Sequence, residues 1–321
     1  MQEPIIPNQR KAWIDALRAM AILMVMYDHH AGCVTVFAFG TPVKMPLFFA
    51  LSGYLFKIKP GGDSVFFKKL FTGVVVPWLC LGVLPIALSF PINGYEHAMT
   101  SLRKVLVGQE LWFMPCFIVS EAIFYYFLKW SKGKTILLVV FCILASIAGH
   151  ILRYNRQLDF FMINIAFTVQ MYFLFGHVIR KYELYIKPHA VGIGIALLIA
   201  YFVIGIVFYP NGWMDVHHAG YSSLPIGLCM AFIGLAALFL LAPQFSNYPK
   251  WVSVVGRNTL VIYMLERYAI MPIELAYDFT THPYWMTSLV TLLFMVWACL
   301  LSIGVSRIFH RYAPWVTGGR Y

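Results

Sequence analysis

Five ionisable side chains lie close together near the start of the chain, within the apolar stretch WIDALRAMAILMVMYDHHA. They are Asp15, Arg18, Asp28, His29 and His30. A histidine can take a proton from a hydroxyl group near neutral pH, and an arginine can grip phosphate or carboxylate with a fork of donors. These residue types together suit proton transfer beside an anionic ligand.

The stretch is predicted to form one helix, which puts three of these side chains on one face. Each residue advances about 100° and rises about 1.5 Å, so Arg18 and His29 differ by roughly 20° around the axis and about 16 Å along it. Asp15 stays on that face, whereas Asp28 and His30 turn away. Because a charge near the membrane centre costs about 2.5 to 3.5 kcal/mol, this face is expected to line a cavity or polar cleft. The simpler alternative is an Asp15–Arg18 ion pair near one interface, with both histidines at the other.

The composition is typical of a protein embedded in a membrane. Of the 321 residues, 61% are hydrophobic and only 12% are Asp, Glu, Lys or Arg. Backbone polar groups in hydrocarbon must be satisfied within each segment, so the apolar runs are predicted to be helices. We expect an all-α polytopic integral membrane protein, a single transmembrane domain over 1–321. Its ten spans are predicted at 12–31, 43–57, 70–91, 110–130, 135–152, 160–179, 189–209, 221–243, 254–275 and 285–308.

The distribution of basic residues predicts the orientation of these spans. With the N-terminus in the cytoplasm, most of the 24 lysines and arginines fall in inner segments or at inner span ends. This excess predicts that both termini are cytoplasmic. The net charge of +11 then reflects topology and contact with anionic membrane lipid, and no nucleic-acid partner is expected.

Several segments resemble the membrane acyltransferase family 3. Its first helix carries an arginine or lysine, ten residues and then a histidine, a spacing that Arg18 and His29 match. The family's later motifs are similar to MPLFFALSGYLF (45–56), ELWFMPCFIVSEAIFYY (110–126) and VVGRNTLVIYMLERY (254–268).

Two positions differ from the family pattern. Members that modify surface polysaccharides often carry two arginines before the third helix, where this chain has Lys68 and Lys69 in VFFKKLFTGVVVPW. These lysines are the expected donor-binding residues there. The late motif often ends in histidine where this chain has Glu266, which leaves the role of the ninth span open.

The resemblance implies transfer of an acyl group, usually acetyl, from acetyl-CoA to a sugar hydroxyl of a surface or lipid-linked glycan, in a bacterial inner membrane. A neutral histidine can take the proton of such a hydroxyl as it attacks the thioester, so His29 is the expected general base. Arg18 would hold the anionic part of the donor or the acceptor, or else fix Asp15.

Further candidates for substrate or donor binding lie on other spans, each with a structural alternative. Ser52, next to Gly53, belongs to a motif that also allows close helix packing. Trp112 suits a wall against a sugar ring or an interfacial aromatic belt. Glu121, inside the fourth span, requires a partner. Asn258 and Tyr263 could bind substrate or stabilise helix contacts.

The main alternative is a transporter or flippase of a glycan or small-molecule intermediate. A transporter can use polar residues at many positions, while acyl transfer needs a base at one, which favours the enzyme. Broken-helix transporters also tend to show matching interrupted halves, and the sequence has none. No metal site is expected, because adjacent histidines on a helix do not face one ion.

Overall fold

The structure is a computed structural model, and it describes residues 11–30, 34–58, 60–153, 160–210, 212–245, 247–274, 277 and 283–318. In this part of the chain nearly all regular structure is helical. The α-helices are α1 (Ala12–His30), α2 (Val34–Leu55), α3 (Gly62–Leu70), α4 (Val76–Leu106), α5 (Phe113–Ser131), α6 (Thr135–Leu152), α7 (Ile163–Thr168), α8 (Gln170–Ile186), α9 (Ala190–Phe208), α10 (Leu224–Leu241), α11 (Lys250–Arg257), α12 (Thr259–Glu274) and α13 (Tyr284–Tyr312).

Short elements join or follow these helices. A π-helical turn η1 (Phe71–Val75) connects α3 to α4, and 3-10 turns form η3 (Lys187–His189), η4 (Ala242–Gln244) and η5 (Pro314–Thr317). The strands β1 (Met214–Asp215) and β2 (Gly220–Tyr221) pair in an antiparallel hairpin. The expectation of an all-α protein is therefore confirmed apart from this small hairpin.

Each of the ten predicted spans contains a helix, but two of them hold a break. The span at 160–179 contains α7 and α8, and the span at 254–275 contains the end of α11 and all of α12. Among the described residues, five helices are long and apolar enough to cross a membrane, or six if the pair at Phe160–Thr168 and Gln170–Glu183, bent by 50°, is one span. The protein is thus an integral membrane protein, and the count of ten and the orientation of the termini stay predictions.

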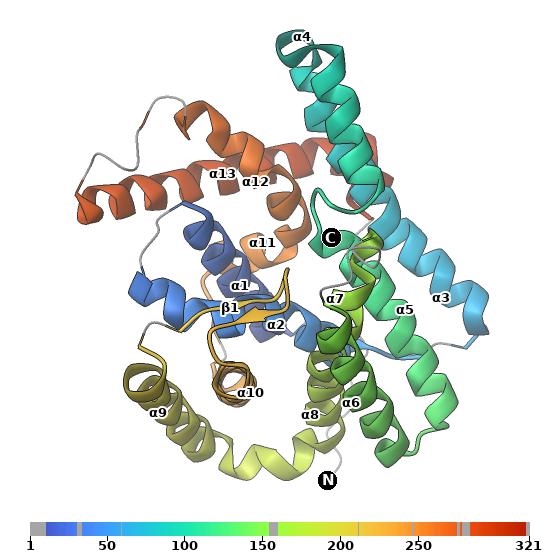
Figure 1. Ribbon diagram of the computed structural model, residues 1–321, viewed down its shortest axis with the longest axis vertical. Helices are drawn as coiled ribbons and strands as arrows, with labels where there is room; N and C mark the ends of the chain where they lie inside the picture. Colours follow the sequence, from blue (N-terminus) through green and yellow to red (C-terminus); the bar gives the residue numbers. More distant parts are fainter. Residues whose placement is uncertain are drawn as a thin grey trace.

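The helix with the ionisable cluster lies at the centre of the molecule. In Figure 1, α1 and α2 are surrounded by α11 to α13 on one side, α8 to α10 on the opposite side, and α3 and α5 on a third. The helix contacts agree with this view, because α1 packs against α2 and α11, and α2 packs against α8 and α10. Most of the length of α1 is therefore in contact with protein.

Two glycines allow α2 and α8 to pack in direct backbone contact. A Cβ atom added to Gly53 would lie 2.0 Å from the carbonyl oxygen of Phe173, and one added to Gly176 would lie 1.8 Å from that of Ala50. Small residues bring helices close together in this way inside membranes. The packing role predicted for the segment around Ser52 is confirmed for Gly53.

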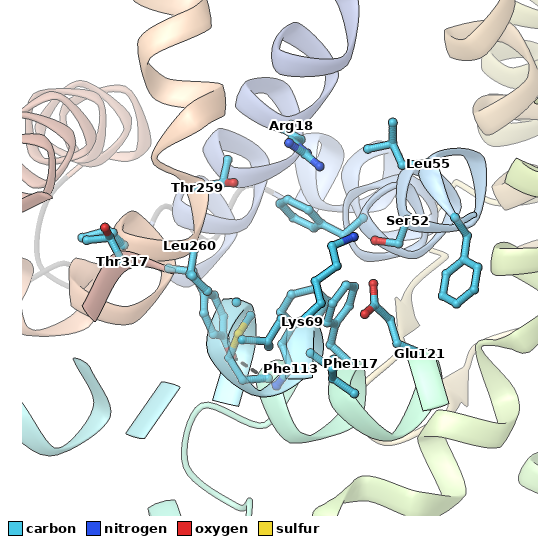
Figure 2. A pocket seen from close by; sticks show the side chains of 18 of the residues that line it. Arg18, Ser52, Leu55, Lys69, Phe113, Phe117, Glu121, Thr259, Leu260 and Thr317 are labelled. Atoms are coloured by element: carbon cyan, nitrogen blue, oxygen red, sulfur yellow. Dashed lines mark hydrogen bonds between the residues drawn. The ribbon is translucent and has the colours of Figure 1, made fainter. Parts of the chain in front are cut away.

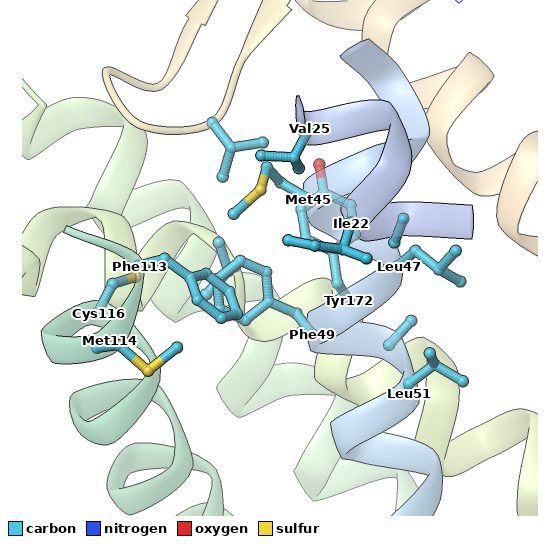
Figure 3. Packing of buried hydrophobic residues seen from close by; sticks show 14 of the residues in the cluster. Ile22, Val25, Met45, Leu47, Phe49, Leu51, Phe113, Met114, Cys116 and Tyr172 are labelled. Carbon is cyan, nitrogen blue, oxygen red and sulfur yellow. The ribbon is translucent and has the colours of Figure 1, made fainter. Parts of the chain in front are cut away.

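Aromatic side chains then hold α5 against this pair of helices. The ring of Phe49 lies 5.3 Å from that of Phe113 and 5.9 Å from that of Phe173. Figure 3 shows Phe49 and Phe113 between the helices, with Cys116 and Tyr172 nearby. Ring pairs at these separations add to the stability gained by burying their area. The N-terminal end of α5 is fixed beside α2 and α8 as a result.

The α2–α8 contact predicts a sharp difference between two glycine substitutions. Gly176→Ala forces a methyl group against backbone and should destabilise the protein by about 3 kcal/mol or more. Gly304→Ala, on α13, meets nothing within 4 Å and should be neutral or stabilise by up to about 1 kcal/mol. Thermal unfolding of each purified variant in detergent, followed by fluorescence, measures the difference. Equal unfolding temperatures for the two variants would contradict the close helix contact.

Candidate active site

A cavity of about 420 Å³ lies between α1, α2, α3, α5 and the junction of α11 with α12. Its polar lining includes several residues expected from the sequence, namely Arg18, Ser52, Lys69, Glu121, Asn258 and Tyr263. In Figure 2 the polar ends of Arg18, Ser52, Lys69 and Glu121 point into the same space. Segments far apart in the sequence thus meet around one cavity.

One face of α1 forms a wall of this cavity. Arg18, Ile22 and Val25 line it, and their spacing of four and then three residues puts them on the same side of a helix. The predicted polar face of α1 is therefore a cavity wall over the part from Arg18 to Val25. His29 continues this face one turn further but does not line the cavity.

The cavity is strongly basic. Among the described residues, four cations line it, Arg18, Lys57, Lys69 and Arg257, against one carboxylate, that of Glu121. The remaining lining is largely apolar, with Phe48, Phe113 and Phe117 among it. A cavity of this kind suits a ligand with an anionic group and an apolar stem.

Arg257 is held in the cavity wall by Asp15. Its Nε atom lies 3.5 Å from the Asp15 Oδ2 atom, and the Asp15 side chain is almost fully buried. The two helices touch at this point, because a Cβ added to Gly256 would lie 1.9 Å from the Asp15 carbonyl oxygen. Asp15 does not line the cavity and instead lies behind Arg257.

Sequence reasoning did not identify Arg257 as a site residue. Its only signal was its place in the late motif VVGRNTLVIYMLERY, directly after Gly256. The contact with Asp15 joins residues 242 positions apart, so no local pattern reveals it.

His29 pairs with a carboxylate on α12. Its Nδ1 atom lies 2.7 Å from the Glu266 Oε1 atom. The His29 side chain is 52% exposed and that of Glu266 only 3%. Among the described residues, the second oxygen of Glu266 has no hydrogen-bond partner. A carboxylate at this distance can orient the imidazole ring and stabilise its protonated form.

The position of Glu266 gives the ninth predicted span a site residue. The sequence left the role of this span open, because the resemblance offers a histidine at that position. In the structure Glu266 faces the histidine of the first helix, one turn beyond Tyr263.

Asn258 and Tyr263 line the cavity, but their polar groups also make helix contacts. The Asn258 Nδ2 atom donates to the Val254 carbonyl at 2.8 Å, and its Oδ1 atom accepts from the Ser306 hydroxyl at 2.6 Å. The Tyr263 hydroxyl accepts a bond from the Phe113 N–H at 3.2 Å, one of the donors that the start of α5 leaves without a helical partner. Both residues thus make the helix contacts that the sequence allowed, and substrate binding by either one stays a prediction.

Two predicted binding residues lie outside the cavity. The Trp112 ring stacks on the His217 ring at 4.6 Å with an interplanar angle of 13°, next to the β1–β2 hairpin. Lys68 lines a separate groove on another side of α3. The remaining ionisable residue of α1 whose side chain is described, Asp28, pairs with Lys44 of α2, while the side chain of His30 is outside the described part.

A known protein family matches most of the chain. The family model described as an acyltransferase domain matches residues 11–307. No curated protein and no solved structure matches the chain. The matched region covers most of the sequence, from α1 with Arg18 and His29 to α13, and the chain therefore belongs to the acyltransferase 3 family of membrane acyltransferases.

Proposed function

We propose that the protein transfers acetyl from acetyl-CoA to a hydroxyl of a carbohydrate, free or lipid-linked, in the synthesis of a surface polysaccharide. The site of action is a bacterial inner membrane, with both termini in the cytoplasm. The observation that carries the proposal is the contact of His29 with Glu266, one helical turn beyond a basic cavity on the same face of α1.

In this proposal His29 is the general base. Its Nδ1 atom faces Glu266, so its Nε2 atom is the one that takes the proton of the acceptor hydroxyl. The hydroxyl oxygen forms a bond to the thioester carbon, the carbon–sulfur bond breaks, and the proton passes from the imidazole to the departing thiolate. Glu266 stabilises the imidazolium that exists between these steps.

The cavity suits the donor. From Arg18 to Val25 the wall of α1 rises about 10 Å, and His29 lies about 6 Å further. The phosphates of acetyl-CoA would pair with Arg18, Lys57, Lys69 and Arg257, while the apolar part of the cavity takes the thioester arm. Glu121 and Ser52 lie on the path of that arm and would hydrogen-bond to its amide groups.

Substitutions of the proposed base and its partner should lower kcat. His29→Ala removes the base and should reduce acetyl transfer about 100-fold or more. Glu266→Gln leaves the imidazolium without a carboxylate and should reduce acetyl transfer roughly tenfold or more. The measurement follows free thiol and labelled acetyl on sugar, with acetyl-CoA and a pool of glycans from the host.

Glu183→Gln is the matched control for Glu266→Gln. Glu183 pairs with Lys11 and Tyr54 and does not line the cavity, so this variant should keep wild-type activity. A folded His29→Ala variant with wild-type activity would refute the assignment of the base and favour a transport function for the polar face of α1.

Substitutions of the cavity arginines should weaken donor binding through its phosphates. Arg18→Gln and Arg257→Gln should each raise KM for acetyl-CoA about tenfold or more, with a much smaller change in kcat, because each removes a charge-assisted hydrogen bond. Asp15→Asn should reproduce part of the Arg257 effect by releasing that side chain.

A donor without phosphates separates binding from misfolding. With S-acetyl-pantetheine in place of acetyl-CoA, both arginine variants should match wild type, since the missing charge then has no partner. Arg311→Gln, at an exposed position near the end of α13 that does not line the cavity, is the control and should leave both KM values unchanged. An equal increase in KM for acetyl-CoA and for S-acetyl-pantetheine would contradict the assignment of these arginines to the phosphates.

A further inference from the structure

Two neighbouring lysines of α3 have different surroundings. Lys69 lines the cavity, where its side chain points toward Ser52 in Figure 2, whereas Lys68 lines a separate groove. Successive helix residues are about 100° apart, so the position that turns Lys69 toward the cavity turns Lys68 away from it. Lys68 is thus not part of the proposed active site, and its charge needs another explanation.

The groove beside Lys68 is open and almost entirely apolar. It has a volume of about 910 Å³ and lies between α3 with η1 on one side and α5 on the other. Phe71 and Trp130, which line it, are 55% and 59% exposed. Lys68 is the one charged residue in this lining as the structure describes it. The segment Gly62–Ala87 is long and apolar enough to cross a membrane, so lipid chains are the expected surroundings of this groove.

Polar contacts fix the two walls of the groove at one end. Asp63, in the first turn of α3, accepts hydrogen bonds of 2.7 Å from the Tyr125 hydroxyl and from the Lys129 ammonium, both on α5. The Phe66 and Tyr125 rings stack at 4.1 Å in the same region. These contacts fix α3 against α5 at that end of the groove.

The ammonium of Lys68 has no carboxylate partner in the part of the chain that the structure describes. Other lysines do, since Lys11 pairs with Glu183, Lys44 with Asp28 and Lys129 with Asp63. Trp130 and Tyr126 line the same groove, with rings 5.6 Å apart, and such residues are enriched where membrane meets water. An unpaired cation and interfacial aromatics beside an apolar groove match a ligand with an anionic head and an apolar chain.

We propose that this groove binds one acyl chain of an anionic phospholipid, whose phosphate pairs with Lys68. The apolar chain lies against Phe71, Ile118 and Val119, and the headgroup reaches the lysine. The site is distinct from the proposed donor cavity, although Leu70 lines both, so a single layer of side chains separates them. The proposal does not depend on acyl transfer.

Quenching of Trp130 fluorescence by brominated lipid tests the proposal directly. The purified protein is placed in phosphatidylcholine nanodiscs in two series. One series contains increasing fractions of brominated phosphatidylglycerol and the other contains increasing fractions of brominated phosphatidylcholine, with the bromine in the upper acyl chain of both lipids. The fluorescence of the Trp130→Phe variant in the same nanodiscs is subtracted from that of wild type, so that the remaining fluorescence comes from Trp130. Half-maximal quenching should need about fivefold less of the anionic lipid, as expected for one lysine near an anionic headgroup.

The neighbouring lysines supply a matched pair of variants. Lys68→Gln should remove the preference for phosphatidylglycerol. Lys69→Gln should retain this preference, although it should weaken binding of the acyl donor in the cavity. Equal quenching by the two lipids in wild type, or an unchanged preference in Lys68→Gln, would overturn the proposal. Absence of quenching by either lipid would also overturn it and would indicate that another protein surface covers the groove.

Discussion

The arrangement of the molecule depends on one constraint, which is that charged side chains inside a membrane need partners. The first helix lies at the centre of the bundle, and three of its ionisable groups pair with residues of three different helices. Asp15 pairs with Arg257 of α11, Asp28 with Lys44 of α2, and His29 with Glu266 of α12. These pairs fix α1 both along its axis and around it, because each partner lies on a separate element. Each pair contains a carboxylate that is almost fully buried, so removing its partner would cost stability, and the helix and its neighbours form a unit.

The same pairs divide the polar face of α1 into two parts with different properties. Toward Arg18 the face borders a basic cavity, and toward His29 it ends in a half-exposed imidazole beside a buried carboxylate. Close packing at Gly53 and Gly176 holds α2 against α8, and the rings around Phe49 hold α5 against these two helices, which leaves the cavity between α5 and α1. One helix can therefore supply a cation for an anionic donor, at Arg18, and a base for proton transfer, at His29, and these two residues lie about 16 Å apart along it.

Helical periodicity was sufficient to predict the parts of this arrangement that belong to one segment. The spacing of Arg18 and His29 gave their common face, and the apolar runs gave ten ranges that each contain a helix. The partners could not be predicted, since Arg257 lies 242 residues from Asp15 and Glu266 lies 237 residues from His29, and they become neighbours only through packing. Nor could the sequence separate Lys68 from Lys69, because that difference depends on which side of α3 faces the cavity. At the break between α11 and α12, the Asn258 side chain bonds to the backbone and to α13, and apolarity does not reveal such contacts.

The most direct test of the account is the position of the donor in the protein. An experimental structure with a non-hydrolysable thioether analogue of acetyl-CoA would give it. The account predicts phosphates against Arg18 and Arg257, and an acyl carbonyl within roughly 6 Å of His29 Nε2, which leaves room for one attacking hydroxyl. An analogue bound with its acyl end away from His29, or with its phosphates outside the basic cavity, would contradict it.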